Sequence, residues 1–559
     1  MHHVSYTHRR GIALVLGLGY ALSVASGAVA EGTWSQKGSF ILGDSAGDNF
    51  GISLSVDSDG DTVAIGAWKD AGNAPSVDAG HVRIFEHSSG TWSPLGTALE
   101  GEAASDYFGS AVSISDAGTR VAVGSPYNDV AGAGVDAGHV QVWELSGGSW
   151  TQMGVSIDGE NAGEQSGFAL ALSGDGTTVA IGSPYTDVDG TDRGSVRVFT
   201  WNGGTSAWDR KGTVDLKGEA NQDRLGYAVA INGEGTIVAA GARQNDRTGV
   251  VDAGHVRTYQ WNAGTSEWDQ WGSDINGEAA GDYFGSAVSL SSAGTTLAVG
   301  APRNSVGLSA TNAGHFRVFA WDNAAGDWAQ QGIDTDGAVG EKLGTSLELS
   351  SSGTRVLAGA PDNGSGGSSA GAARLYEYSA GVWSALATDY LGGAGDEAGT
   401  SVSLSGDGTT ASIGYPFNDD GGADAGGARI FTYSVTVEQT PASTGTPGIY
   451  LHVAGPVGRS VAGSPVYYGS DRVAVTSTYL LRIYSSTGIT EYVLAEGTVD
   501  ARGNLEASIA LPPLVEGDYD VTFSGTHSGG HSLHLSSRVS VDDRGHYTAI
   551  DANVSHITG

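Results

Sequence analysis

Acidic, amide and basic side chains recur in the turn segments of this chain, and their types suit hydrogen bonding to a polar ligand. Carboxylates can also act in pairs as an acid and a base, which requires two of them about 5 to 9.5 Å apart. Loop residues held by a rigid scaffold commonly form binding sites. We therefore expect a ligand at these turns. The candidate binding residues are Glu102, Asp106, Asn128, Asp129, Asp187, Arg243, Asp246, Glu278, Asp282 and Arg303.

Two further patterns are typical of metal or catalytic sites but lack the necessary context. The sequence Asp-Ala-Gly-His, at 78–81, 136–139 and 252–255 with the variant Asn312 to His315, lies in separate repeats, and other repeats have Ser195, Ala372 or Gly427 in place of the histidine. We interpret its Asp and Gly as turn residues and its His as the polar start of a strand. Ser45 lies in a Gly-x-Ser-x-Gly motif, which needs a strand-to-helix turn to act as a nucleophile elbow. We predict no catalytic residue and no metal ligand.

The charge and composition exclude several classes of protein. The chain has 62 acidic and 27 basic residues, a net charge of −35, which would repel the phosphates of nucleic acids and anionic membranes. It contains no cysteine, so disulfides and thiolate metal sites are excluded. Hydrophobic residues make up 39% of the chain, which is enough to build cores.

Residues 1–30 are similar to a secretory signal peptide. Arg9 and Arg10 precede an apolar run over 11–24, and Ala28 and Ala30 have the small-x-small pattern of a cleavage site. No later segment has the ~18 apolar residues of a transmembrane helix. We expect cleavage near Ala30, and a secreted or cell-surface protein without a transmembrane segment.

A glycine that follows an aromatic or apolar residue recurs every 55 to 59 residues and divides much of the chain into seven units. Each unit contains segments in which apolar residues alternate with others, as in strands with one buried face. Tight Gly-containing turns, such as the one at Gly118, join the first two segments. The recurring glycines are Gly51, Gly109, Gly167, Gly226, Gly285, Gly344 and Gly399.

The segments that contain tryptophan predict how the repeated units close into a ring. Six units end in a strand marked by tryptophan, but none follows Tyr433, whereas Trp34 precedes the first unit. A ring whose last blade is completed by an N-terminal strand explains both observations, while an open solenoid would leave exposed edges. We predict an all-β fold with a seven-bladed β-propeller over residues 31–436.

The repeated succession Phe108-Gly109 to Gly124-Ser125-Pro126, and its copy from Phe284 to Pro302, resembles the FG-GAP repeat of integrin alpha-subunit propellers and their bacterial relatives. This resemblance implies a secreted or surface propeller used in adhesion or ligand binding. Integrin-like units carry a long calcium loop between their first two strands, which here is only a tight turn. Calcium prefers six to eight oxygen ligands, so we expect no cofactor, with bound calcium as the alternative.

A second domain follows a linker at 437–448 that is rich in Thr, Ser and Pro. About seven short alternating segments over 449–559 predict a small immunoglobulin-like β-sandwich. The segment 511–521 resembles the last hairpins of immunoglobulin-like modules on bacterial surface proteins. We interpret His527, His531 and His534 as surface residues.

These observations predict a monomeric, secreted or surface protein that is not an enzyme. Its expected partner is an extracellular protein or a glycan, bound by the acidic loop face of the propeller, and nucleic acid is not expected. One alternative is a propeller hydrolase or lyase with carboxylates at the mouth of its channel. Another is a purely structural component of a surface or matrix.

Overall fold

The computed structural model describes residues 32–435, apart from 71–76, 188, 248, 306–310 and 387–388, together with strand segments between 449 and 556. Its chain divides into two compact units, of which one is Val29–Val437 and the other includes Glu438–Gly559. The predicted signal peptide (1–30) and linker (437–448) lie outside the described residues. No helix in the described part is both long and apolar enough to cross a membrane.

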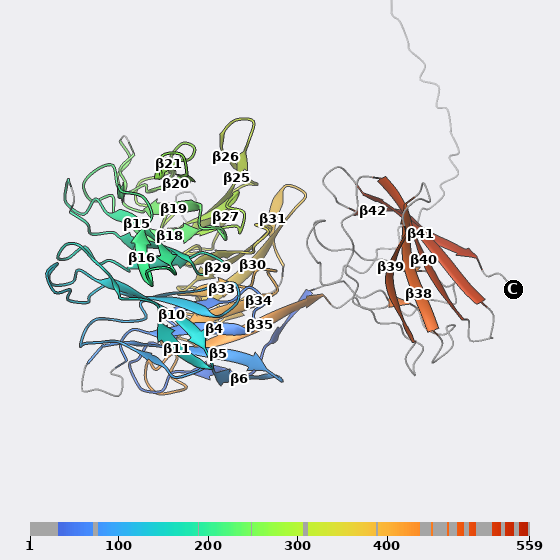
Figure 1. Cartoon of the computed structure of the whole chain (residues 1–559), viewed down its shortest axis with the longest axis horizontal. Coiled ribbons are helices and arrows are strands. Elements are labelled where there is room, and N and C mark those ends of the chain that lie inside the picture. Colours follow the sequence, from blue (N-terminus) through green and yellow to red (C-terminus); the bar gives the residue numbers. More distant parts are fainter. Residues whose placement is uncertain are drawn as a thin grey trace, which may run out of the picture. The chain divides into compact units, whose positions relative to one another are not determined.

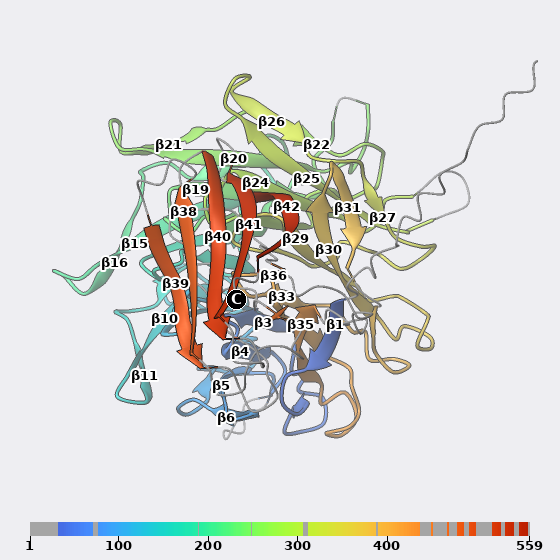
Figure 2. The same ribbon diagram turned by 90° about the vertical axis from the view of Figure 1, so that its right-hand side faces the viewer.

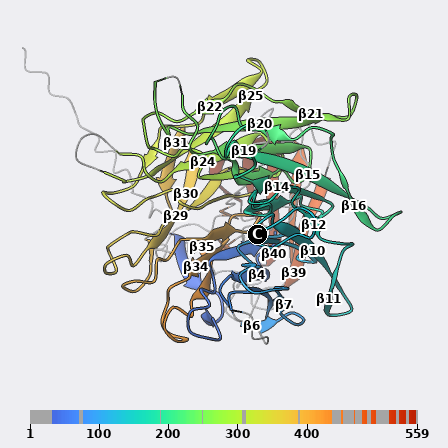
Figure 3. The same cartoon turned by 90° about the vertical axis from the view of Figure 1, so that its left-hand side faces the viewer.

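The first unit is a seven-bladed β-propeller, as the repeat predicts (Figure 1). Each blade is an antiparallel meander of four strands with a two-residue strand added beside the third. Figure 3 shows the blades following one another around a ring in chain order. The innermost strands are β3 (Ser53–Val56), β8 (Ala111–Ile114), β13 (Ala169–Leu172), β18 (Leu225–Ile231), β23 (Ala287–Leu290), β28 (Leu347–Leu349) and β33 (Val402–Leu404).

The third strands are the longest regular elements of each blade, and most residues of the second strands are buried. The second strands are β4 (Thr62–Ala67), β9 (Arg120–Ser125), β14 (Thr178–Ser183), β19 (Ile237–Ala242), β24 (Thr296–Ala301), β29 (Arg355–Ala360) and β34 (Thr410–Tyr415). The third strands are β5 (His81–Ser88), β10 (His139–Ser146), β15 (Ser195–Asn202), β20 (His255–Asn262), β25 (His315–Asp322), β30 (Ala372–Ser379) and β35 (Gly427–Val435).

The outer strands are short and partly exposed. Those of blades one to six are β6 (Thr91–Pro94), β11 (Ser149–Gln152), β16 (Ala207–Arg210), β21 (Glu267–Gln270), β26 (Asp327–Gln330) and β31 (Val382–Ala385). The two-residue strands are β2 (Ile41–Leu42), β7 (Leu99–Glu100), β12 (Ile157–Asp158), β17 (Leu216–Lys217), β22 (Ile275–Asn276), β27 (Thr335–Asp336) and β32 (Tyr390–Leu391).

The N-terminal strand β1 (Gly32–Gln36) closes the ring. It pairs antiparallel with β35, placing Trp34 opposite Tyr433, and so replaces the missing outer strand of blade seven. The predicted closure is confirmed. The four Asp-Ala-Gly-His or Asn-Ala-Gly-His histidines begin third strands, as predicted, and are His81, His139, His255 and His315.

The apolar cores lie between neighbouring blades. One cluster joins Val82 and Ile84 of blade one to Val121 and Val123 of blade two, with Trp150 beside them. The indole Nε1–H of Trp150 donates to the backbone carbonyl of Leu95 in the preceding blade at 2.7 Å. These repeated tryptophans therefore stabilise the contacts between blades.

A closed circle of backbone hydrogen bonds surrounds the axis where the first two strands of each blade turn. In every blade one residue donates its N–H to the carbonyl of its counterpart in the next, at 2.8 to 3.1 Å, and the seventh returns to the first. Such a circle requires all seven blades at once. The residues are Ser58, Asp116, Gly174, Gly233, Ser292, Ser351 and Gly406.

The second unit contains an antiparallel sheet in the order β39–β38–β40–β41–β42 and a separate pair, β36 with β37 (Figure 2). The described residues confirm strands in this region, while the sandwich remains a prediction. The strands are β36 (Ile449–Tyr450), β37 (Tyr467–Tyr468), β38 (Thr478–Ser485), β39 (Glu491–Thr498), β40 (Gly517–Thr526), β41 (Ser532–Val541) and β42 (Tyr547–His556).

Candidate functional site

The seven innermost strands surround a central channel whose two ends differ. The tight turns between first and second strands lie at one end, which we call the hairpin end. The loops that enter each first strand and leave each second strand lie at the other end, which we call the channel mouth. The candidate residues predicted from the sequence all lie in loops of the mouth side.

Seven residues with unusual backbone geometry surround the mouth, one in each blade. They lie two positions before the recurring glycine and have φ between 50° and 57°, a left-handed conformation that side chains other than Asn rarely adopt. Each carbonyl accepts the N–H three residues later, at 3.1 to 3.2 Å, so the turn fixes the backbone whatever the side chain. The residues are Asn49, Tyr107, Gln165, Arg224, Tyr283, Lys342 and Glu397.

Aromatic side chains pack against one another on the first blades of the mouth. The rings of Trp68 and Tyr107 have centroids 5.7 Å apart, and Tyr107 contacts Tyr127 edge-on at 5.1 Å. A separate pair, Phe168 and Tyr227, lies on the next two blades with ring centroids 5.0 Å apart. Aromatic faces and edges of this kind can pack against the C–H groups of a ligand.

Arginines follow the aromatic side chains around the mouth. The guanidinium of Arg243 lies 3.5 Å from the ring centroid of Tyr227, and that of Arg303 lies 4.3 Å from the centroid of Tyr283. Arg224 lies 4.9 Å from the centroid of Tyr185. Among the described residues, neither Arg243 nor Arg303 has a carboxylate within 4.0 Å. Neither guanidinium is therefore neutralised by a neighbouring carboxylate, and of their donor nitrogens the Nε of Arg243 is buried.

A lysine and two carboxylates lie at the channel mouth on blades six and seven. Lys342 Nζ lies 2.6 Å from Asp362 Oδ2. Burial raises the pKa of Glu397, and the neighbouring charge of Asp362 raises it further. A carboxyl group that holds its proton to higher pH beside a second carboxylate suits acid–base chemistry.

Three of the predicted site residues stabilise turns from buried positions. Asp106 accepts hydrogen bonds from the backbone N–H of Ala103 at 2.9 Å and from Asn128 Nδ2 at 3.0 Å. Asp282 accepts in the same way from Asn304 Nδ2 at 3.2 Å. Burial raises the pKa of both aspartates. The structure brings Asp106 and Asn128 together, and their use by a ligand stays a prediction.

The other predicted carboxylates are exposed but separated on different blades. Three of them, Asp129, Asp187 and Asp246, each accept a backbone N–H from their own loop at 2.8 to 3.0 Å. Glu102 accepts from Gln141 Nε2 at 2.7 Å. Glu278 lies 3.6 Å from a guanidinium nitrogen of Arg317. The only predicted site residues with cation contacts to mouth tyrosines are Arg243 and Arg303, within the part of the chain that the structure describes.

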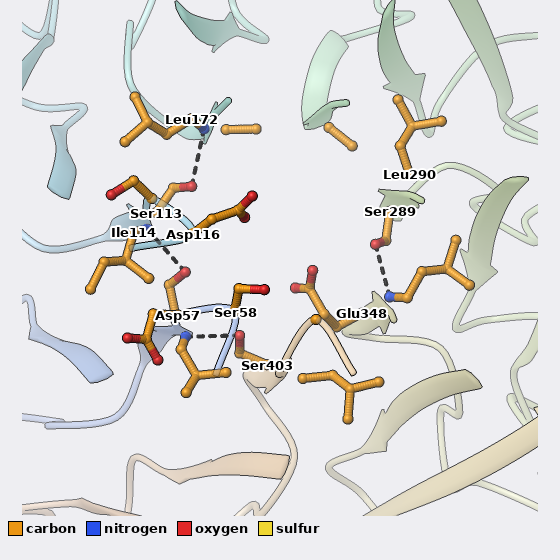
Figure 4. A pocket seen from close by; sticks show the side chains of 18 of the residues that line it. Asp57, Ser58, Ser113, Ile114, Asp116, Leu172, Ser289, Leu290, Glu348 and Ser403 are labelled. Carbon is orange, nitrogen blue, oxygen red and sulfur yellow. Dashed lines mark hydrogen bonds between the residues drawn. The ribbon is translucent and has the colours of Figure 1, made fainter. Parts of the chain in front are cut away.

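The hairpin end contains a cavity of about 210 Å³ lined by all seven innermost strands (Figure 4). Glu348 points into this cavity, where Ser58, Asp116 and Ser289 also lie. Burial raises the pKa of Glu348 to about 8. A drug-sized ligand occupies roughly 300 to 1,000 Å³, so this cavity suits water or a small ion. We therefore take the mouth as the candidate site for a larger ligand.

Sequence reasoning missed most of the mouth. Tyr107, Tyr283 and Lys342 occupy one position of the repeat, and the predicted site contained the regular carboxylates beside them instead. Their signal was a position two residues before the recurring glycine whose type differs in nearly every unit. Because the turn needs only a left-handed backbone there, side-chain differences at this position are not required by folding.

Comparisons with known proteins support the fold alone. No family model and no curated protein matches the chain. Among solved structures it is similar to a putative 6-phosphogluconolactonase from Bacteroides uniformis, at 12% identity and a TM-score of 0.43 over 61% of this chain and 86% of that one. It is also similar to the periplasmic gluconolactonase PpgL of Pseudomonas aeruginosa, at 14% identity and a TM-score of 0.42 over 61% and 85%.

These comparisons correct one expectation. The sequence analysis predicted that the chain is not an enzyme. That prediction is contradicted by the two solved structures named above, which are described as a putative 6-phosphogluconolactonase and a gluconolactonase. The FG-GAP resemblance matches no family model and stays a prediction.

Proposed function

We propose that the protein hydrolyses an anionic carbohydrate bound across the channel mouth. The observation that carries this proposal is the pair Arg243 and Arg303, which lie over tyrosine rings and have no carboxylate partner among the described residues. In a chain with 62 acidic and 27 basic residues, unpaired arginines beside one another indicate a site for a negatively charged group.

The chemistry of these groups favours a sugar acid or a sulfated or phosphorylated sugar. A guanidinium presents planar donors that match carboxylate, sulfate and phosphate oxygens. Aromatic side chains such as Trp68 and Tyr107 supply apolar surface for the C–H faces of a sugar ring. A neutral, apolar ligand would leave the arginine donors without partners, which costs free energy.

The carboxylates on blades six and seven supply the reactive groups. Glu397, whose pKa is raised by burial, is the acid that donates its proton to the leaving oxygen. Asp362, paired with Lys342 at 2.6 Å, is the base that takes a proton from the attacking water. The C–O bond of the substrate breaks as the water oxygen forms the new bond, so the reaction needs no further reagent.

Binding and turnover can be measured separately on a panel of acidic and neutral oligosaccharides and sugar lactones. Replacing both Arg243 and Arg303 with alanine should weaken the binding of acidic members about 10- to 100-fold, the loss of one or two charged hydrogen bonds. Glu397→Gln should leave binding nearly unchanged and lower turnover by about 10²- to 10⁴-fold. The control is Arg120→Ala, at the hairpin end.

The outcomes distinguish the two parts of the proposal. Binding of acidic members without turnover by any variant would reject hydrolysis and retain anionic-glycan binding. Equal binding by the double-arginine variant and the wild type would reject the mouth as the site. Preference for neutral members would reject the assigned ligand class.

A further inference from the structure

Two consecutive blades place a histidine and two carboxylates together at the same position of the repeat. In each group, one ligand atom from each of the three side chains lies within 4.8 Å of the other two. The histidine begins a third strand, one carboxylate follows the outer strand of that blade, and the other comes from the preceding blade. The groups are Glu219, His255 and Asp274, and Glu278, His315 and Asp334.

An arginine donates hydrogen bonds to both carboxylates of the first group. Arg257 donates to Asp274 through Nε and Nη2 at 2.8 and 2.9 Å, and also to Glu219. These bonds use the oxygens that a metal ion would need, and the guanidinium supplies the positive charge. The first group is therefore a closed ion-pair network.

The equivalent arginine of the second group makes different contacts. Arg317 donates to the backbone carbonyl of Asn276 at 2.7 Å, and its guanidinium lies 4.3 Å from the ring centroid of Phe284. Its distance to Glu278 Oε1 is 3.6 Å, longer than a charged hydrogen bond. The oxygens of Glu278 thus keep lone pairs that are free to bind another cation.

The histidine of the second group has an unused nitrogen, as do the other three histidines at this position of the repeat. The His315 side chain is 1% exposed, and its Nε2 has no hydrogen-bond partner among the described residues. A buried polar atom without a partner costs about 1 to 3 kcal/mol. Asp334 accepts one hydrogen bond, from Gln330 Nε2 at 2.7 Å, and a carboxylate has further acceptor sites.

We propose that Glu278, His315 and Asp334 bind one divalent transition-metal ion such as Zn²⁺. Imidazole nitrogen and carboxylate oxygen are both ligands of Zn²⁺ and related divalent ions. Asp336, whose Oδ1 lies 3.9 Å from His315 Nδ1, adds negative charge, so the three carboxylates outweigh the single charge of Arg317. Three protein ligands leave a coordination position for water.

Among the described residues no blade other than these two brings a histidine and two carboxylates together in this way, and the first group is closed by Arg257, so we expect one such site. Blade two has His139 and Glu102, but Ser156 stands where blade five has Asp334. Blade six has Ala372 in place of the histidine. The site is independent of the sugar binding proposed at the mouth.

Zinc binding by the full chain tests the inference. Calorimetric titration with Zn²⁺ should show that His315→Ala and Asp334→Asn each remove one site or weaken it more than 100-fold. His255→Ala, in the closed group, should leave that site intact. The chain has 14 histidines in total. Comparing the variants distinguishes zinc bound at this site from zinc bound by other histidines. With Co²⁺, the visible spectrum of the wild type should be lost only in the first two variants.

The result can overturn the proposal in two ways. Retention of wild-type zinc binding by both His315→Ala and Asp334→Asn would reject the site. An equal loss in His255→Ala would assign the ion to the first group instead. Asp334→Asn preserves the shape of the side chain, and far-ultraviolet circular dichroism of each variant shows whether it has folded.

Discussion

Glu348 differs in type from the residues at the same position of the other six blades. At the same position of four other blades, a serine Oγ accepts a backbone N–H from the following blade at 2.9 to 3.1 Å, and Ala171 and Ala230 occupy the remaining two. Glu348 is the one ionisable residue at this position, and burial raises its pKa to about 8. The carboxyl group is thus held in a cavity that disfavours its charge. The four serines are Ser55, Ser113, Ser289 and Ser403.

The free energy of unfolding should therefore fall as pH rises between the pKa of Glu348 in the unfolded chain and its pKa in the folded protein. In the unfolded chain a glutamate ionises near ~4.3, and in the folded protein near 8. Between these values the folded state binds more protons, so the free energy of unfolding decreases as pH rises. Glu348→Gln removes this effect and should stabilise the protein at pH 8.5 by on the order of a few kcal/mol, with little change at pH 4.

Thermal unfolding midpoints of the wild type and Glu348→Gln, compared at the two pH values, check this prediction. The exposed Glu86→Gln serves as control and should give the same difference from the wild type at both. A Glu348→Gln variant that is no more stable than the wild type at pH 8.5 would contradict it.

At the scale of elements, blades approach one another through pairs of glycines. Gly182 of β14 lies against the backbone of Gly226, so a Cβ at Gly182 would overlap the Gly226 carbonyl oxygen. The same contact recurs between every two neighbouring blades. The two glycines that mark each repeat in the sequence therefore face each other across blade boundaries.

Gly182→Ala should destabilise the propeller by about 3 kcal/mol, because the overlap involves backbone and can be relieved only by moving a strand. Gly203 is the matched control, since the nearest atom to an added Cβ lies at 3.9 Å, and Gly203→Ala should change stability by less than about 0.5 kcal/mol. Urea unfolding followed by tryptophan fluorescence measures both. Equal midpoints for the two variants would show that the close approach is not required.

At the scale of the whole molecule, stability depends on joining the two ends of the propeller chain. Trp34 of β1 lies 5.0 Å from Tyr433 and 5.1 Å from Tyr390, measured between ring centroids. Ser401 Oγ of the last blade donates to the carbonyl of Gly51 in the first at 2.7 Å. The ring is closed both at its outer edge and beside the channel.

Deleting residues 32–36 should leave β35 as an unpaired edge, and such edges pair with other chains. We expect the unfolding midpoint to fall by about 5 °C or more, and light scattering to detect association. Trp34→Ala should produce part of this loss, whereas Thr33→Ala, at an exposed position of the same strand, should not. An intact midpoint after the deletion would mean that β1 does not stabilise the ring.

The sequence by itself determined the seven blades and their closure. The spacing of Gly51, Gly109 and their successors repeats along the chain, and the presence of Trp34 with no tryptophan strand after Tyr433 specifies where the ends meet. These features are local, because alternation, turn glycines and strand length can each be recognised within one unit. The histidines that begin third strands were predictable for the same reason.

The side chains that meet are set by how neighbouring blades pack in three dimensions. Arg243 and Tyr283, or Glu278 and His315, lie about 40 residues apart in the chain, and their contacts depend on how one blade is set against the next. The tertiary structure also showed that the Asp106 carboxylate accepts a hydrogen bond within a turn, whereas Arg303 has no carboxylate partner in the part of the chain that the structure describes. Identical positions of a repeat have the same backbone, but the partners of a side chain come from a different blade, and the repeat does not specify them.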